Sequence, residues 1–118
     1  VNLVGHKTMD GPYEGYSTYV TASKGEGFGL SLLEALGSAC FIVGFNVNYG
    51  NTTFIKNGNT GYLADYIEFD EESNIESLAT TIRLSLESDS LSRSDCLSLA
   101  RDYKTEKVLN SWKEFLNA

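Results

Sequence analysis

The sequence has 118 residues, of which 42% are apolar, and its nine basic and sixteen acidic residues give a net charge of −7. This length can build one hydrophobic core but is short for two domains. No cluster of Lys and Arg could neutralise a phosphate backbone, so the composition argues against a nucleic-acid partner. The longest apolar run, residues 39–45, falls far below the roughly 20 residues that span a bilayer, and we expect a soluble chain without a transmembrane segment.

The N-terminal quarter shows strand and loop signals. Val1–Val4 is a short apolar run that ends at Gly5 and predicts a strand. A short helix is expected within residues 9–16, and β-branched and aromatic residues predict a strand over 17–23. Because the chain opens directly on a strand and without Met, we expect a piece of a longer protein.

The next segment predicts a helix followed by a buried strand. Leu30, Leu33 and Leu36 lie at helical spacing, and Gly37 is placed to end the helix. Cys40–Phe45 is too short and apolar for a helix of its own and predicts a strand.

Further along, a polar loop over 46–51, a short helix over 53–56 and a turn over 57–61 are expected before a last short strand over 61–64. The acid-rich segment 68–76 is interpreted as a solvated linker. Three helices are then predicted from apolar spacing, so we divide the single domain into a βαβ part, residues 1–64, and C-terminal helices, residues 65–118. Strands that alternate with helices indicate a parallel α/β sheet.

A glycine-rich loop follows the strand over 17–23, where parallel sheets hold their ligands. Gly25, Gly27 and Gly29 leave the amides of Phe28 and Leu30 open to an anion at a helix N-terminus. The spacing is neither the dinucleotide fingerprint nor a P-loop, and a plain tight turn explains the glycines equally well.

Two carboxylates flank this loop. Glu34 shares a helix face with Leu30, and we expect it to be buried, where a carboxylate needs a partner. A backbone N–H or a Lys would serve, and so would the two hydroxyls of a ribose. With Glu26 on the loop, the order carboxylate, anion site, carboxylate is that of a nucleotide-sugar site.

The segment 23–35, with Glu26 and Glu34, resembles the E-x7-E motif of retaining glycosyltransferases of the GT-B fold, in glycosyltransferase family 4. The likeness extends from Val1 to residues 61–63. Residues 37–55 resemble two branches of the family in particular, the N-acetylglucosaminyltransferases of serine-rich adhesins in the accessory Sec system and the poly(glycerol-phosphate) α-glucosyltransferases. The chain departs from the family pattern at four places, none of them Glu26 or Glu34: Gly25, residues 39–41, Asn46 and Thr60.

The resemblance implies the C-terminal, Rossmann-like half of a GT-B fold and a donor such as UDP-GlcNAc or UDP-glucose, with no metal and no cofactor. It implies that Glu26 meets the donor hexose as the catalytic residue and that Glu34 holds the ribose. Donor-binding residues would be Gly27, Phe28, Gly29 and Leu30, with His6 near the uracil. The acceptor would be a serine-rich protein or a glycerol-phosphate polymer.

Three readings of the function stay open at this stage. The first is the donor-binding part of an enzyme, inactive as this piece alone. The second is a non-catalytic GT-B-like subunit that binds the acceptor polypeptide and supports an active enzyme. The third, a glycosidase, fits poorly because its two carboxyls must face one bond.

Cys40 and Cys96 form neither a metal site nor a disulfide framework, which favours a reducing, cytoplasmic setting. The resemblance adds a peripheral position at the inner face of the cell membrane as an alternative.

Overall fold

The computed structural model describes residues 2–5, 11 and 13–118. Three parallel strands form one sheet in the order β1-β2-β3: β1 (Thr18–Val20), β2 (Phe41–Phe45) and β3 (Gly61–Ala64). In this register Tyr19 lies opposite Ile42, and Val43 lies opposite Tyr62. The predicted parallel α/β sheet is confirmed, with β3 at the expected residues.

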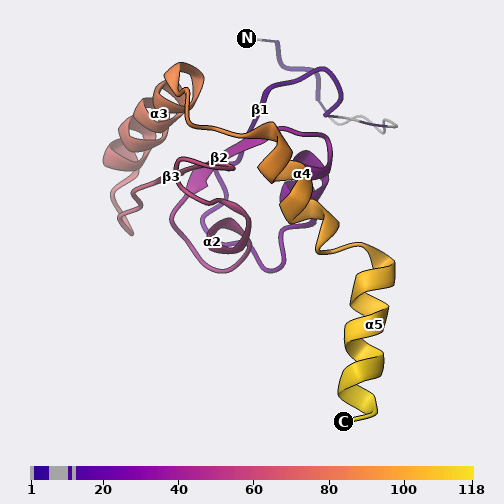
Figure 1. Cartoon of the computed structure of the whole chain (residues 1–118). Helices are drawn as coiled ribbons and strands as arrows, with labels where there is room; N and C mark the ends of the chain where they lie inside the picture. The colour runs from indigo at the N-terminus through magenta and orange to yellow at the C-terminus, as the bar shows by residue number, and fades with distance from the viewer. Residues whose placement is uncertain (1, 6–10, 12) are drawn as a thin grey trace.

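Five helices complete the described chain: α1 (Leu30–Gly37), α2 (Gly50–Phe54), α3 (Glu71–Glu87), α4 (Arg93–Arg101) and α5 (Thr105–Leu116). α1 and α2 connect consecutive strands, as parallel neighbours require. α3 packs along β2 and β3, α4 packs on α1, and α5 extends away from the rest of the chain (Figure 1). No helix within the described residues is long and apolar enough to cross a membrane.

The core lies between the sheet and the helices α1, α2 and α4. Leu32 and Leu36 of α1 are fully buried, as are Ile42 of β2 and Phe54 of α2. Burial of each such side chain contributes about 1.5–3 kcal/mol. The apolar face of α1 therefore fixes the helix against the sheet and sets the direction of its N-terminus.

The buried face of α1 differs from the one that the leucine spacing predicted. Leu30 is 60% exposed and Leu33 is half-buried, whereas Leu32, Ala35 and Leu36 are fully buried. The buried positions follow the same 3.6-residue period, but they are shifted around the helix relative to the prediction.

The expected acidic linker over 68–76 is wrong in its second half, because α3 begins at Glu71. The Asp70 carboxylate caps this helix by accepting a hydrogen bond from the Ser73 N–H at 3.1 Å. Glu71 and Glu72 then lie in the first turn, where the helix dipole favours negative charge. The acidic residues are therefore a helix start signal as well as a solvated surface.

Three smaller predictions also need correction. Residues 2–5 form no strand, and Val1 lies outside the described residues. Of the helix expected within 9–16, residues 13–15 form a turn in which the Tyr16 N–H donates to the Tyr13 carbonyl at 3.2 Å, and residues 9, 10 and 12 lie outside the described residues. The helix expected at 53–56 begins earlier, at Gly50.

Candidate functional site

The glycine loop, residues 24–29, connects the end of β1 to the start of α1 at the carboxyl edge of the sheet. Gly29 takes a left-handed conformation, with φ of 84°, and its carbonyl accepts hydrogen bonds from the Leu32 and Leu33 N–H groups at 3.0 and 3.1 Å. A side chain at this φ would be strained. Gly29 therefore aligns the N-terminus of α1 with the loop before it.

The N-terminus of α1 presents unpaired amides. No side chain caps it, and among the described residues no acceptor faces the N–H groups of Phe28, Leu30 or Ser31. Such orphan N–H groups at a helix start carry a partial positive charge that suits a phosphate. The predicted residues Gly27, Phe28, Gly29 and Leu30 thus form one short segment at the start of α1.

Phe28 belongs to a cluster of three aromatic rings. Its ring is 55% exposed and packs edge-on against Phe54 of α2 and against Tyr103, which follows α4, with centroids at 5.5 and 5.8 Å. Phe54 and Tyr103 are also in contact, at 5.1 Å. This cluster ties the glycine loop to the C-terminal helices, a connection that the sequence did not indicate.

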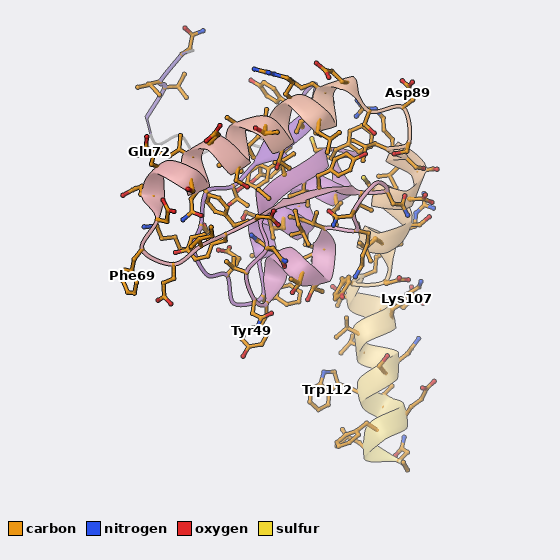
Figure 2. All side chains as sticks on the ribbon, turned by 90° about the vertical axis from the view of Figure 1, so that its left-hand side faces the viewer. Tyr49, Phe69, Glu72, Asp89, Lys107 and Trp112 are labelled. Atoms are coloured by element: carbon orange, nitrogen blue, oxygen red, sulfur yellow. The ribbon has the colours of Figure 1, made fainter. Side chains whose placement is uncertain are left out.

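Glu26 is partly buried, and its backbone is held by the loop after β2. Its N–H donates to the Asn48 carbonyl at 3.1 Å, and its own carbonyl accepts from the N–H groups of Tyr49 and Gly50, the latter at 3.0 Å. The Tyr49 ring is 72% exposed and projects from the body beside α2 (Figure 2). The segment 48–50 is therefore part of the site. Sequence reasoning missed it, although a Gly in a polar loop after a buried strand was a usable signal.

The prediction that Glu34 is buried is wrong. Its side chain is exposed on the face of α1 that it shares with Leu30, opposite the buried Leu32 and Leu36. Burial, together with the neighbouring Tyr19 and Glu34, raises the pKa of the Tyr13 hydroxyl. The carboxylate is open to a ligand rather than satisfied within the fold. His6 lies outside the described residues.

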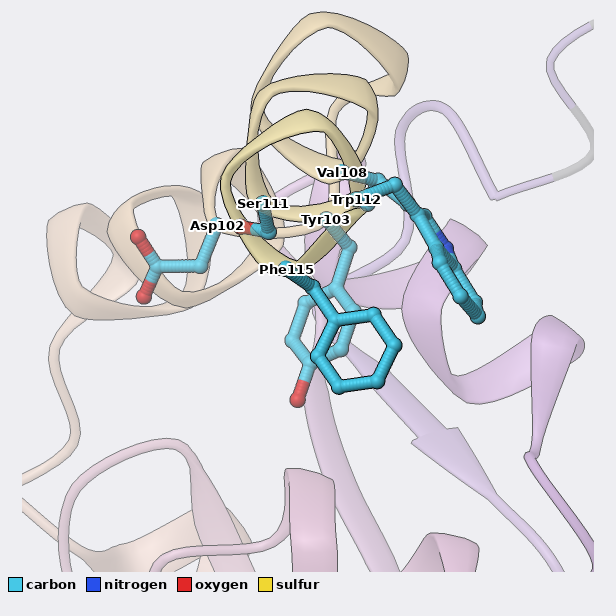
Figure 3. A pocket seen from close by; sticks show the side chains of 6 residues that line it. All are labelled: Asp102, Tyr103, Val108, Ser111, Trp112 and Phe115. Carbon is cyan, nitrogen blue, oxygen red and sulfur yellow. The ribbon is translucent and has the colours of Figure 1, made fainter. Parts of the chain in front are cut away.

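A separate apolar groove runs along α5. Tyr103, Val108, Trp112 and Phe115 line most of it, and the Tyr103, Trp112 and Phe115 rings project to the same side of the helix (Figure 3). None of its lining residues belongs to the glycine loop or to the segment 48–50, and we take the glycine loop, which carries Glu26, as the candidate donor site.

Comparison with known proteins assigns the family. The family model described as glycosyl transferases group 1 matches residues 2–102. The chain belongs to the group 1 glycosyltransferases. This family assignment covers both carboxylates and the whole sheet.

Individual relatives of this glycosyltransferase chain agree with the predicted branches. The chain is 40% identical, over 98% of its length, to the UDP-N-acetylglucosamine–peptide N-acetylglucosaminyltransferase GtfA subunit of Streptococcus parasanguinis. It is 29% identical, over 83% of its length, to the poly(glycerol-phosphate) alpha-glucosyltransferase of Bacillus subtilis (strain 168). It spans 24% of the first of these relatives and 14% of the second, about a quarter or less of either.

Solved structures show the same fold. The pneumococcal O-GlcNAc transferase GtfA in complex with UDP and GlcNAc superposes with a TM-score of 0.80 and 34% identity, covering 98% of this chain and 24% of that chain. A structure of a GtfA/B complex gives a TM-score of 0.77 at the same identity, covering 99% of this chain and 24% of that one. The GT-B assignment from the sequence is confirmed.

Proposed function

We propose that this chain is the donor-binding part of a longer retaining glycosyltransferase that transfers N-acetylglucosamine from UDP-GlcNAc. One observation carries the proposal: an uncapped helix N-terminus with unpaired amides lies between two carboxylates that are free of partners in the described chain, Glu26 and Glu34. The names of the similar N-acetylglucosaminyltransferases support this donor, as does the related structure that holds UDP and GlcNAc.

Each part of the donor has a matching group. The amides of Phe28, Leu30 and Ser31 would donate to the diphosphate, and the Glu34 carboxylate would accept from the ribose hydroxyls. Glu26 would meet the hexose. The bond between the anomeric carbon and the diphosphate oxygen breaks, the acceptor hydroxyl oxygen bonds to the same carbon, and its proton passes to the departing diphosphate. Negative charge grows on UDP as the first bond breaks. The helix N-terminus stabilises that charge.

The acceptor and the assembly belong to the same proposal. A serine-rich polypeptide is the acceptor that the adhesin-modifying branch would take, and a glycerol-phosphate polymer is the alternative. A second glycosyltransferase-like subunit is a proposed partner, supported by the related GtfA/B complex.

The decisive test is a titration of the ¹⁵N-labelled chain with UDP, with uridine as the matched control. UDP should shift the amide signals of Phe28 to Ser31, because these N–H groups would bind the diphosphate. Uridine, which lacks the diphosphate, should leave them in place. If millimolar UDP moves no signal in this segment, the chain does not provide the diphosphate site.

A second experiment separates the enzyme from a non-catalytic partner subunit. In the longer polypeptide, Glu26→Gln should abolish transfer of N-acetylglucosamine while leaving assembly with the second subunit intact, because the side chain lies in the donor site. An unchanged transfer rate in that variant would favour the partner-subunit role.

A further inference from the structure

The side-chain stem of Glu26 passes between two glycines. A Cβ atom at Gly29 would lie 3.4 Å from the Glu26 Cγ, and one at Gly50 would lie 3.1 Å from it. Gly50 lies in a different part of the chain, at the start of α2. The direction of the Glu26 carboxylate thus depends on a residue 24 positions away.

Gly50 also touches the backbone of the glycine loop. An added Cβ would lie 2.7 Å from the Phe28 carbonyl oxygen and 3.1 Å from the Gly29 Cα, and real Cβ atoms essentially never approach others below 3.0 Å. Even alanine at this position would push the two segments apart by several tenths of an ångström. The Gly50 N–H also donates to the Glu26 carbonyl, so the same shift would strain that hydrogen bond.

The loop that carries Gly50 is anchored at its base by the next residue. The Asn51 side chain is fully buried, and its Nδ2 donates to the carbonyl of Phe45, the last residue of β2, at 2.8 Å. A rigid strand therefore holds Asn51, Asn51 holds the segment 48–50, and that segment holds Glu26. The first link is a hydrogen bond, the second is the chain itself, and the third consists of hydrogen bonds and van der Waals contacts.

We propose that Gly50 and Asn51 are positioning residues that aim Glu26 at the donor sugar. The inference rests on the proposed function of Glu26. A displacement of about 0.5 Å is enough to take a catalytic group out of productive geometry. We expect Gly50→Ala in the longer polypeptide to lower kcat for UDP release from UDP-GlcNAc, in the presence of a serine-rich peptide, about tenfold or more.

The affinity for UDP separates positioning from a general structural effect. UDP has no hexose, so in Gly50→Ala its Kd should rise by clearly less than kcat falls: the shift at Phe28 also reaches the amide segment, but the loss at Glu26 affects only the hexose. A Kd that rises as much as kcat falls would overturn the proposal, because the amide segment would then be the part disturbed. Gly37→Ala is the matched control: a Cβ there meets nothing within 4 Å, and kcat should not change.

A double-mutant cycle tests whether Gly50 works through Glu26. In a Glu26→Gln background, Gly50→Ala should change the residual kcat less than twofold, whereas an independent role predicts the full tenfold loss again. Should Gly50→Ala not fold, Asn51→Ser removes the Nδ2 donor without burying a charge, and the same cycle applies. Full additivity in either cycle overturns the inference alone. A wild-type protein that releases no UDP from UDP-GlcNAc overturns the proposed function, and the inference with it.

Discussion

Replacement of Glu34 by Gln should separate ligand binding from folding. The side chain is exposed, and no hydrogen bond or ion pair joins it to another described residue. An exposed substitution of this kind changes the free energy of unfolding by less than about 0.5 kcal/mol. Hydrogen bonds to a charged group contribute about 1.5–3 kcal/mol each, and Gln keeps a weaker, neutral acceptor for the ribose. We therefore expect UDP binding to weaken roughly tenfold to a hundredfold, since 1.4 kcal/mol is a factor of ten.

Isothermal titration calorimetry with two nucleotides makes this test specific for the ribose. The unmodified chain should bind UDP more tightly than 2′,3′-dideoxyuridine diphosphate, and in Glu34→Gln this preference should shrink roughly tenfold or more. Glu114→Gln, which removes an exposed carboxylate from the distant α5, is the matched control for net charge. If Glu34→Gln and Glu114→Gln weaken UDP binding equally, or if Glu34→Gln keeps the full preference for the ribose hydroxyls, the assignment of Glu34 to the ribose is refuted.

Two further predictions concern stability. Burial raises the pKa of the Cys96 thiol from an ordinary 9.0 to about 11, so the unfolded thiol ionises first and stability is lost as the pH rises from 9 to 11. At pH 10 this amounts to on the order of 1 kcal/mol, and urea unfolding at pH 8 and pH 10 should show a smaller fall for Cys96→Ala than for the unmodified chain. A Cβ at Gly61 would lie 1.7 Å from the Ile42 carbonyl oxygen, so Gly61→Ala must part β2 from β3. We expect a loss of about 3 kcal/mol or more, and equal urea midpoints for Gly61→Ala and Gly37→Ala would contradict this packing.

Local signals predicted the order of elements, and contacts between distant segments explain the errors. The turn expected over 57–61 placed the start of β3 correctly, and glycines followed by leucines placed the start of α1. The spacing alone could not show which leucines of α1 are buried, because the buried face is the one that packs against the sheet and α4. The acidic residues before α3 suited both a linker and a capped helix start, and only the Asp70 hydrogen bond decides between them.

The site residues also divide into those that a local motif reveals and those that only distant contacts reveal. Glu26, Glu34 and the amides between them form a short continuous motif, so the sequence was sufficient to nominate them. Gly50 and Tyr103 contact that motif from 24 and 75 positions beyond Glu26 and Phe28, and no local pattern could reveal those contacts. Reasoning from one sequence finds groups that touch a ligand more readily than the residues that hold those groups in place.

The exposure of Glu34 strengthens its proposed role for a physical reason. A buried carboxylate would need a partner inside the protein, and such a partner would compete with a ribose for the same lone pairs. Leu30, on the same face of α1, is 60% exposed. An exposed apolar side chain and a carboxylate free of described partners, beside unpaired helix amides, are poorly explained by folding of this chain. They are the surface expected where a helix start faces a bound nucleotide sugar.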